Sequence, residues 1–313
     1  MYKKNLGIIG AGYIVGEYLK ILSKYKFFSL YGIYSRTIPK CKKYKKKYNI
    51  HKIYKNYDDM LLDKNIDCVL IAVSPENMFE VIKNVIPYKK PFFSEKPIVN
   101  NYKNYTNLLR LINKYKTKNM IGYNRRYYSV FKNGLNIIKK YGKISSIDIE
   151  GNERFYRLEN KISKIRKKNW LFYNSIHTLD LINFFVGDIK FYKIIKKNTK
   201  KFYKNFIIVF ESKNNIIGTY SSNWHSSSGW NIKINGNKNS LYFNPLEKGN
   251  HINEKLQIKE IHISEDDKKF KPGFVEQLKI FKKIVNGDKV NKNLYVNIQK
   301  SKNTIKLMKE LNE

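Results

Sequence analysis

The chain has 313 residues, of which 62 are Lys or Arg and 25 are Asp or Glu, so its formal net charge is +37. Its 42% of hydrophobic residues and 15% of aromatic residues exclude a disordered chain, and its length corresponds to about two domains of roughly 150 residues each. No apolar run approaches the roughly 18 residues of a membrane helix, and two cysteines are too few for a disulfide framework. We therefore expect a cytoplasmic globular protein of two domains, without a membrane partner.

The surplus of positive charge consists mostly of Lys rather than Arg. Arg is the residue whose planar guanidinium pairs with phosphates and bases, so a Lys-rich chain is a weaker match to a nucleic-acid-binding protein. The Lys residues also occur with many Asn, Ile and Tyr, whose codons can be written almost wholly in A and T. We interpret most of the excess as compositional bias on a solvated surface and predict no specific nucleic-acid partner. The alternative, a nucleic-acid-binding protein, predicts strong and salt-sensitive binding of DNA.

Strand-like and helix-like segments alternate in the first third of the chain. The expected strands are residues 5–9, 27–34, 67–73, 91–94 and 120–123. The expected helices are residues 13–24, a Lys-rich segment around 40–47, a segment centred on Val81, and residues 108–115. Strands separated by helices of this length form a parallel sheet with helices on both faces. The pattern therefore predicts an α/β domain over residues 1–123, with a dinucleotide-binding function suggested by the motif described below.

The pattern changes after Tyr123, where a second domain is expected over residues 124–313. Its expected helices are residues 129–140, 171–185, 274–285 and 298–311, and its expected strands are residues 147–150, 191–198, 205–212, 216–222, 230–234 and 240–243. Residues 153–168 are polar and rich in Arg and Lys, so we expect a long loop there. A run of strands with alternating burial predicts a large, mostly antiparallel open sheet with helices on one face.

A glycine-rich turn follows the first expected strand and opens the first expected helix. There Gly10 permits a tight turn, and Gly12 lets the backbone approach a pyrophosphate. The helix that begins with Tyr13 and Ile14 supplies free N–H groups and the positive end of its dipole. Val15 replaces the third glycine of the fingerprint. We predict that Gly10, Gly12, Tyr13 and Ile14 bind a dinucleotide. A turn with a purely structural role is the alternative.

The end of the second expected strand carries Ser35, Arg36 and Thr37. An enzyme that selects NAD usually places a carboxylate here, which accepts hydrogen bonds from the ribose hydroxyls. No acidic residue lies between Glu17 and Asp58, and hydroxyls with a guanidinium suit a 2′-phosphate instead. The segment predicts NADP as the cofactor, with NAD as the alternative if Arg36 only stacks on the adenine.

The charged pair Glu95 and Lys96, followed by Pro97, comes directly after an apolar strand. That position is the carboxyl edge of the sheet, where doubly wound folds bind their ligands. A lysine at this edge can donate a hydrogen bond to a substrate oxygen, whereas a merely solvated ion pair is the simpler interpretation when the segment is taken alone.

Six motifs in this order resemble the Gfo/Idh/MocA family of dehydrogenases, which includes glucose–fructose oxidoreductase and inositol dehydrogenase. They are Gly10-Ala-Gly12, Ser35-Arg36, Ser74-Pro75, Glu95-Lys96-Pro97, Gly122-Tyr-Asn-Arg125-Arg126 and His177-Thr-Leu-Asp180. The resemblance covers nearly the whole chain, and Glu-Lys-Pro is its most specific element.

This resemblance implies an N-terminal Rossmann domain and a C-terminal α/β domain that binds substrate and whose open sheet often forms the oligomer interface. It implies hydride transfer between a nicotinamide cofactor and a hydroxyl-bearing carbon of a sugar, cyclitol or sugar nucleotide. We therefore expect a small-molecule substrate and a homo-oligomer, either a dimer or a tetramer.

The resemblance also implies roles for single residues. Lys96 would hydrogen-bond the reacting oxygen, and His177 would be the base in oxidation and the acid in reduction. Glu95 would position Lys96 near the nicotinamide ribose. The remaining residues implied are Ser74 and Pro75 at the cofactor, and Arg125, Tyr173, Asn174 and Asp180 at the substrate. Imidazole suits the proton transfer because its pKa is near ~6.5.

Two departures from the family pattern stand in this chain. Tyr173 occupies a position where many members have Asp, and a Tyr or Asn cannot supply the negative charge that raises the pKa of a neighbouring imidazole. Phe79 stands where the family usually has a His. These changes motivate an alternative function, a cofactor-binding sensor or scaffold without turnover.

Other polar and aromatic residues give weaker signals. The basic residues of 153–168 would bind a substrate phosphate or carboxylate if that loop overhangs the cleft, with a solvated loop as the alternative. Trp230 is most simply explained by packing on the sheet or in an oligomer. His51, His251 and His262 lack the spacing of metal ligands, and no metal is expected.

Overall fold

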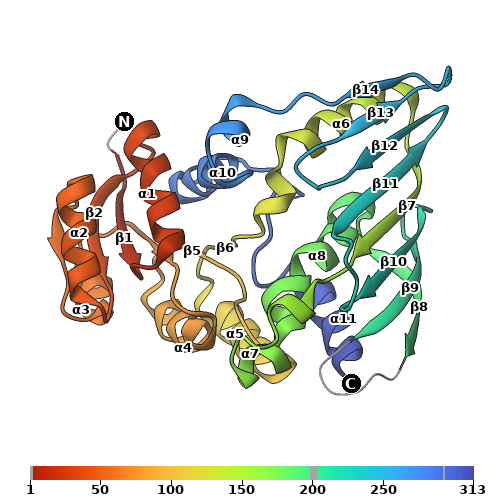
Figure 1. The fold of residues 1–313 in the computed structure, drawn as a ribbon. Helices are drawn as coiled ribbons and strands as arrows, with labels where there is room; N and C mark the ends of the chain where they lie inside the picture. The colour runs from red at the N-terminus through yellow and green to blue at the C-terminus, as the bar shows by residue number, and fades with distance from the viewer. Residues whose placement is uncertain (1–2, 198–203, 292) are drawn as a thin grey trace. The chain divides into compact units, whose positions relative to one another are not determined.

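The computed structural model describes residues 3–197, 204–291 and 293–313. The chain divides into two compact units (Figure 1). The N-terminal unit comprises Met1–Asn124 and Lys269–Lys302, and the open-sheet unit comprises Arg125–Lys268 and Asn303–Glu313. Each unit contains its own sheet, so the predicted combination of a parallel and a mostly antiparallel sheet is confirmed.

The N-terminal unit is built on a parallel sheet in the order β3-β2-β1-β4-β5-β6. Its strands are β1 (Asn5–Ile9), β2 (Ser29–Tyr34), β3 (Lys52–Ile53), β4 (Cys68–Ile71), β5 (Phe92–Ser94) and β6 (Asn119–Ile121). The buried strand β4 is wholly apolar, as expected for a sheet covered on both faces. The strand order reverses between β1 and β4, and this switch point is where folds of this kind bind ligands.

The described residues of this unit form the helices α1 (Tyr13–Tyr25), α2 (Ile38–Tyr48), α3 (Tyr57–Leu62), α4 (Pro75–Val85), α5 (Tyr102–Tyr115) and α10 (Phe274–Asn286), with a short 3₁₀ turn at Ile86–Tyr88. Because parallel crossovers are right-handed, α1 and α2 lie on one face of the sheet and α4 and α5 on the other. The helix α5 buries Tyr105, Leu108 and Ile112 at helical spacing. In the Lys-rich helix α2 only Cys41 is buried, which makes its basic side chains a solvated face.

The segment Lys269–Lys302 is the main difference from the predicted domain boundary. The expected second domain, 124–313, included it, whereas in the structure it groups with the N-terminal unit. Hydrogen bonds explain why: the Ile121 N–H donates to the Val296 carbonyl at 2.8 Å, and the Ile298 N–H donates to the side-chain Oδ1 of Asn119 at 2.8 Å. The ring of Phe281 also packs against Phe93, with centroids 5.7 Å apart.

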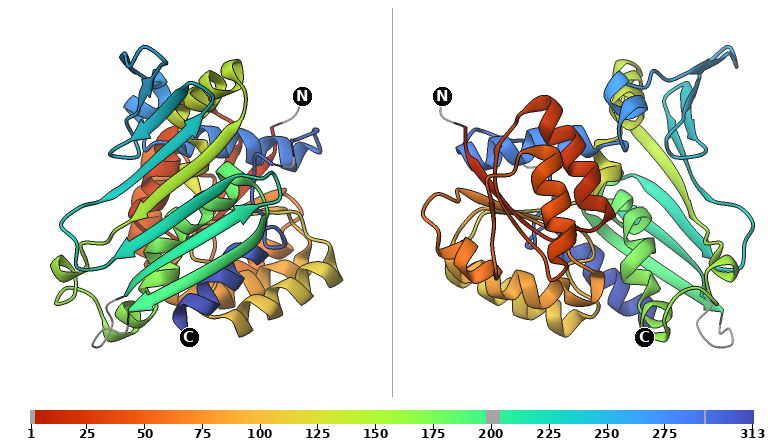
Figure 2. Two further views of the ribbon diagram at one scale, coloured as in Figure 1. Left: turned by 90° about the vertical axis from the view of Figure 1, so that its right-hand side faces the viewer. Right: turned by 60° about the vertical axis from the view of Figure 1, so that its left-hand side comes forward.

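The open-sheet unit has the strand order β14-β13-β12-β11-β7-β10-β9-β8, and its strands are in full view in the left panel of Figure 2. They are β7 (Ile144–Gly151), β8 (Ile189–Lys197), β9 (Asn205–Ser212), β10 (Ile217–Asn223), β11 (Trp230–Gly236), β12 (Asn239–Phe243), β13 (Asn250–Ile252) and β14 (Ile258–Glu260). Among the described strands of this second sheet, only β7 and β10 pair in parallel. In β9 every second residue is buried, so one face of the sheet is covered and the other is open.

The helices on the covered face include α6 (Ser129–Tyr141), α8 (Ile176–Val186) and α11 (Lys302–Asn312), with the short helices α7 (Lys164–Lys168) and α9 (Glu265–Lys269) in the connections. Short 3₁₀ turns lie at Asn124–Tyr127 and Phe155–Arg157. A π-helical turn, Leu171–Ser175, leads directly into α8. Tyr192 of β8 donates a hydrogen bond to Glu310 of α11 at 2.6 Å, which fixes the last helix to the sheet.

The expected elements differ from the structure mainly where segments are short. The expected loop 153–168 contains α7 and a 3₁₀ turn, and α3, α9, β3, β13 and β14 were not predicted. Residues 298–301 precede α11 instead of forming its first turn. The last residue of the expected strand 191–198 lies outside the described residues.

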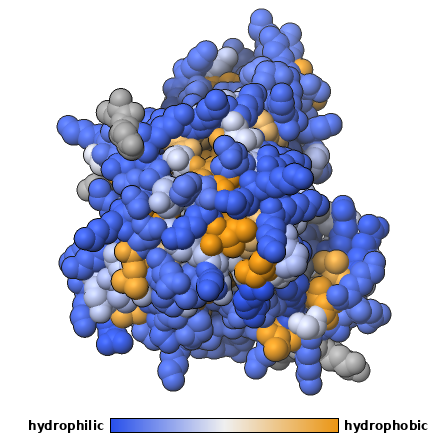
Figure 3. Space-filling view, turned by 90° about the vertical axis from the view of Figure 1, so that its left-hand side faces the viewer, coloured by the Kyte–Doolittle hydropathy of each residue, from blue (hydrophilic) through white to orange (hydrophobic). Residues whose placement is uncertain are grey.

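The surface seen in Figure 3 is largely hydrophilic, with small hydrophobic areas between polar side chains. This agrees with the interpretation of the Lys surplus as a solvated surface. Within the described ranges, no helix has both the length and the apolar character needed to cross a membrane.

Candidate active site

The carboxyl ends of β1, β2 and β4 approach one another closely at Gly10. Its N–H donates to the Tyr34 carbonyl at 2.7 Å, and its φ of +124° lies in the region that favours glycine. A Cβ atom at Gly10 would lie only 2.2 Å from the Ala72 carbonyl oxygen. The first glycine of the motif is therefore required for the turn itself.

Gly12, in contrast to Gly10, has open space where a side chain would be. A Cβ atom there would meet no heavy atom within 4 Å, and its backbone is extended at φ −76°. The helix α1 begins at the next residue, Tyr13, and its first turn contains no acidic side chain. Free N–H groups and an unfilled space at a helix N-terminus fit the pyrophosphate of a dinucleotide.

Two further predicted cofactor segments lie at the same edge of this sheet, after β2 and β4. Ser35 follows β2 and its hydroxyl accepts a hydrogen bond from the Thr37 N–H at 3.2 Å, while the Arg36 side chain is exposed. Ser74 precedes α4, whose first residue is Pro75. All these residues follow the carboxyl ends of parallel strands, which is the arrangement that the sequence predicted.

Glu95 and Lys96 follow β5 at this edge. Glu95 is buried, and its carboxylate accepts a short hydrogen bond from the Tyr18 hydroxyl and a second one, at 3.3 Å, from the Lys96 N–H. Burial raises the pKa of Glu95, while the Tyr18 hydrogen bond and the Lys96 charge act in the opposite direction. The Lys96 side chain is half-buried.

The open-sheet unit contains the other predicted catalytic residue, His177, which is 3% exposed in α8. Its ring lies 6.2 Å from the ring of Trp230 on β11. The guanidinium of Arg125 lies over the same indole, 4.8 Å from its centroid. Trp230 thus brings two predicted site residues together, although its sequence position suggested only packing.

Asp180 follows His177 by one helical turn and is 1% exposed. Arg126 binds both carboxylate oxygens, from Nε to Oδ2 and from Nη2 to Oδ1 at 2.8 Å. This bidentate pair fixes α8 to the turn that precedes α6. Any contact of Asp180 with a substrate stays a prediction.

Glu153, which is 5% exposed, is a site residue that was not predicted from the sequence. Asn174 donates to its Oε2 at 2.7 Å, and Ser175 donates to its Oε1 at 2.9 Å. Burial raises the pKa of Glu153 to about 7, against the effect of these hydrogen bonds and of the Arg125 charge. Glu153 therefore places a buried carboxyl group on the turn that carries Tyr173 and Asn174.

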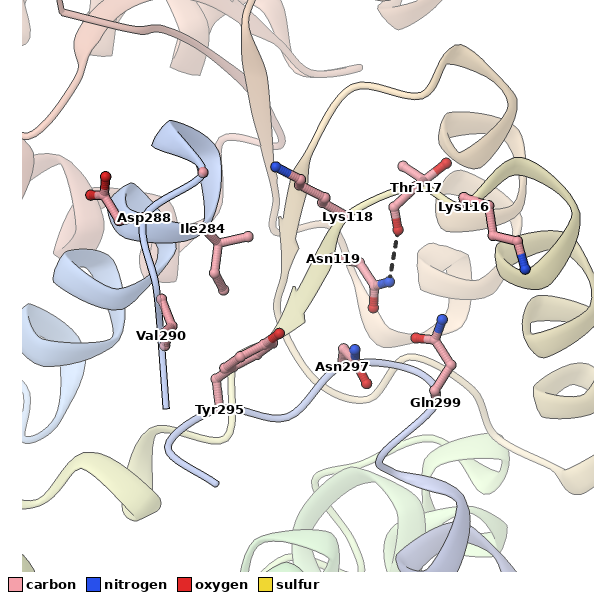
Figure 4. A pocket seen from close by; sticks show the side chains of 11 residues that line it. Lys116, Thr117, Lys118, Asn119, Ile284, Asp288, Val290, Tyr295, Asn297 and Gln299 are labelled. Atoms are coloured by element: carbon pink, nitrogen blue, oxygen red, sulfur yellow. Dashed lines mark hydrogen bonds between the residues drawn. The ribbon is translucent and has the colours of Figure 1, made fainter. Parts of the chain in front are cut away.

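A separate pocket of about 350 Å³ lies at the amino end of β6 (Figure 4). Asn119, the first residue of β6, and Lys118, which precedes it, border the pocket on one side. Tyr295 and Asn297 of the returning segment 269–302 border it on the other. Because it lies at the amino end of the sheet, it is not part of the edge formed by Gly12 and Lys96. In the residues that the structure describes, no group of three or more His, Cys, Asp or Glu side chains is arranged to hold a metal ion.

Comparison with solved structures identifies the fold across the whole chain. The dehydrogenase MviM of Clostridium difficile is 20% identical in sequence and superposes with a TM-score of 0.80 over 99% of both chains. The arrangement of a Rossmann domain and a mostly antiparallel open sheet is therefore one that solved proteins share.

Two curated relatives match parts of the sequence. An uncharacterized oxidoreductase, YrbE of Bacillus subtilis, is 26% identical over 188 residues, and a myo-inositol 2-dehydrogenase of Thermotoga maritima is 27% identical over 128 residues. The matches cover 58% and 41% of this chain, but only 53% and 38% of the respective relatives.

The model of an oxidoreductase family with an NAD-binding Rossmann fold matches residues 4–123, and this family is the one that the six motifs resemble. The match spans all six strands of the parallel sheet and includes Gly10, Gly12 and Lys96. Residues 4–123 of this chain are therefore similar to the NAD-binding Rossmann domain of the Gfo/Idh/MocA family of oxidoreductases.

Proposed function

We propose that this chain is an NAD(P)-dependent oxidoreductase that transfers a hydride to or from a hydroxyl-bearing carbon of a sugar, cyclitol or sugar nucleotide. The observation that carries the proposal is the unfilled turn at Gly12, which opens α1 at the switch point of the sheet. The presence of Glu95 and Lys96 at the same edge supports a reaction there rather than binding alone. The myo-inositol 2-dehydrogenase among the relatives supports a cyclitol or sugar as the substrate class.

A nicotinamide cofactor held at the edge of Gly12 and Lys96 would supply the acceptor or donor of the hydride. The Lys96 ammonium donates a hydrogen bond to the substrate oxygen and stabilises the negative charge that develops there. His177 takes the hydroxyl proton in oxidation and returns it in reduction. Lys96 belongs to the N-terminal unit and His177 to the open-sheet unit, so the proposal requires both side chains to face one substrate.

The substrate side is assigned to Arg125, Tyr173 and Asn174. Arg125 lies over Trp230 beside His177, and it carries a charge that attracts an anionic substituent of the substrate. Asn174 is already held by Glu153 through its amide N–H, which leaves its carbonyl oxygen as the acceptor for a substrate hydroxyl.

NADP is the proposed preference, because Arg36 is exposed and no carboxylate follows β2. Titration with NADH and NADPH tests this preference: tighter binding of NADPH that is lost in Arg36→Ala supports it. Equal affinities that Arg36→Ala leaves unchanged would remove the proposed preference for NADP.

A cofactor-binding sensor or scaffold is the second candidate function, since buried Tyr173 cannot supply a carboxylate beside His177. The discriminating experiment incubates the protein with NAD⁺ or NADP⁺ and a panel of polyols, cyclitols and sugar nucleotides, and follows the formation of reduced nicotinamide. Turnover of any member supports the oxidoreductase. Tight cofactor binding without turnover of any member supports the sensor.

A further inference from the structure

We propose that Tyr18 is the positioning residue for Glu95, and that the returning segment 269–302 completes the cofactor edge through Gln277. This inference rests on the proposed function, because Glu95 matters for catalysis only if a nicotinamide cofactor binds at that edge. It assigns a role to a helix, α10, that lies outside the family match at residues 4–123.

A chain of hydrogen bonds joins three elements. The Gln277 amide of α10 donates to the Tyr18 hydroxyl of α1 at 2.7 Å, and that hydroxyl donates to Oε1 of Glu95, which follows β5. Tyr18 and Gln277 are both fully buried. Because the Gln277 amide occupies an acceptor site of the hydroxyl, the Tyr18 proton points toward the carboxylate.

Packing alone does not require this hydroxyl. The Tyr18 ring stacks on Phe274 of α10 with centroids 4.7 Å apart, and it meets the edge of Phe93 at 5.6 Å. A phenylalanine would make the same two ring contacts. The hydroxyl is therefore explained by its two polar partners rather than by the aromatic cluster.

The carboxylate also needs this donor. Glu95 is buried, and an ionised carboxylate is costly to bury unless it is hydrogen-bonded. The charged groups that act on it are Lys96, which follows it, and Lys271, which precedes α10; both favour its ionised form. Its Oε2 accepts the Lys96 backbone N–H at 3.3 Å, so Tyr18 provides the donor for the other oxygen. Tyr18 thereby orients Glu95 beside the predicted catalytic lysine.

Tyr105 provides a matched control. It is also fully buried in the N-terminal unit, and its hydroxyl donates to the Ile298 carbonyl at 2.9 Å, so Tyr105→Phe likewise removes one buried hydrogen bond to the returning segment. We expect Tyr18→Phe to weaken the binding of NADH and NADPH about tenfold, the size of the loss when a buried polar group is left without its hydrogen bond. Tyr105→Phe should leave both affinities unchanged.

A double-mutant cycle separates positioning from packing. If Tyr18 acts through Glu95, then Tyr18→Phe has no further effect on cofactor affinity once Glu95→Ala is present. An undiminished effect in that background, or wild-type affinity in Tyr18→Phe, would overturn the inference. Gln277→Leu serves as a second variant if Tyr18→Phe does not fold, and it should weaken binding in the same direction.

Failure of the proposed function has a different signature. If the wild-type chain binds neither NADH nor NADPH, the oxidoreductase proposal fails, and the same cycle is measured on the unfolding equilibrium constant. Coupling of about tenfold between Tyr18→Phe and Glu95→Ala would then still support the positioning of Glu95. Additive effects of the two substitutions would overturn it.

Discussion

Two glycines, only two positions apart, meet opposite surroundings at the first turn of the N-terminal sheet. Gly10 has a positive φ, and a Cβ atom there would lie 2.2 Å from the Ala72 carbonyl oxygen, whereas Gly12 faces empty space. Gly10→Ala should therefore lower the free energy of unfolding by about 1–3 kcal/mol, because both the backbone and the carbonyl resist the new methyl group. Chemical denaturation measures this loss.

Gly12→Ala should leave the free energy of unfolding within about 0.5 kcal/mol of wild type. It should nevertheless weaken the binding of NADH and NADPH, because the methyl group projects into the space that a pyrophosphate would fill. Fluorescence titration measures the affinity. Unchanged cofactor affinity in Gly12→Ala would show that this turn is only structural.

Glu153 should give the folding free energy a distinctive pH dependence. Burial raises its pKa from 4.5 to about 7, so the folded state binds the proton more tightly than the unfolded state does. The contribution of protonated Glu153 to the stability of the folded state is therefore fully present below pH 4.5 and is lost as the pH rises through about 7. It amounts to about 3 kcal/mol for a fully buried group.

The Gln side chain of Glu153→Gln cannot titrate, so this variant does not share the loss of stability that wild type shows as the pH rises. Between about pH 5 and about pH 8, the free energy of unfolding of wild type should therefore fall relative to that of the variant by up to about 3 kcal/mol. Denaturation curves of both proteins at several pH values measure the difference. A difference that stays constant with pH would mean that Glu153 has an ordinary pKa.

The contrast between Gly12 and Glu153 explains what sequence can predict about single residues. Gly12 lies in a local motif, so its neighbours in the chain were enough to predict that it stands in the turn between β1 and α1. Glu153 receives its hydrogen bonds from Asn174 and Ser175, which lie more than twenty residues away in sequence. Within the basic segment 153–168 it looked like a solvated charge.

At the scale of elements, the open face of the second sheet carries apolar residues in register. Ile195 of β8 pairs with Ile207 of β9, and both side chains are exposed, as are Val209 and Ile217 nearby. Contiguous apolar side chains on a sheet face favour contact with another protein surface. We propose that this face joins copies of the chain into the oligomer that the family resemblance implies.

Ile207→Lys should shift the sedimentation of the protein toward a smaller species, because the charge would be buried in the contact. Ile165→Lys is the control, since Ile165 is also an exposed isoleucine, with 59% of its surface exposed, but belongs to the helix α7 and not to a strand of the sheet. The interface proposal would be wrong if wild type sediments as a monomer, or if both variants behave as wild type does.

The periodicity of apolar residues predicted the long elements well, because a helix or strand of eight or more residues repeats its pattern several times. The short elements depend on their surroundings instead. The helix α7 has no buried residue, and β14 is exposed along its whole length. Neither has a hydrophobic pattern from which it could be predicted.

At the scale of the whole molecule, the chain returns to its first unit after building the second. The predicted boundary after Tyr123 lies close to the observed division after Asn124. Residues 269–302, however, were expected in the second domain and group with the N-terminal unit. Their hydrogen bonds to Asn119 and Ile121 join positions far apart in the chain. No local pattern marks such a pairing, because its partners are specified only by the folded sheet.

The central claim is that Lys96 and His177 act on one substrate beside a nicotinamide ring. The most direct measurement compares the turnover and the cofactor affinity of wild type, Lys96→Ala and His177→Ala with the best substrate of the panel. We predict that each variant loses at least about 100-fold in turnover, the contribution typical of a proton-transferring group, while its cofactor dissociation constant stays near that of wild type. Full turnover in either variant would contradict the claim.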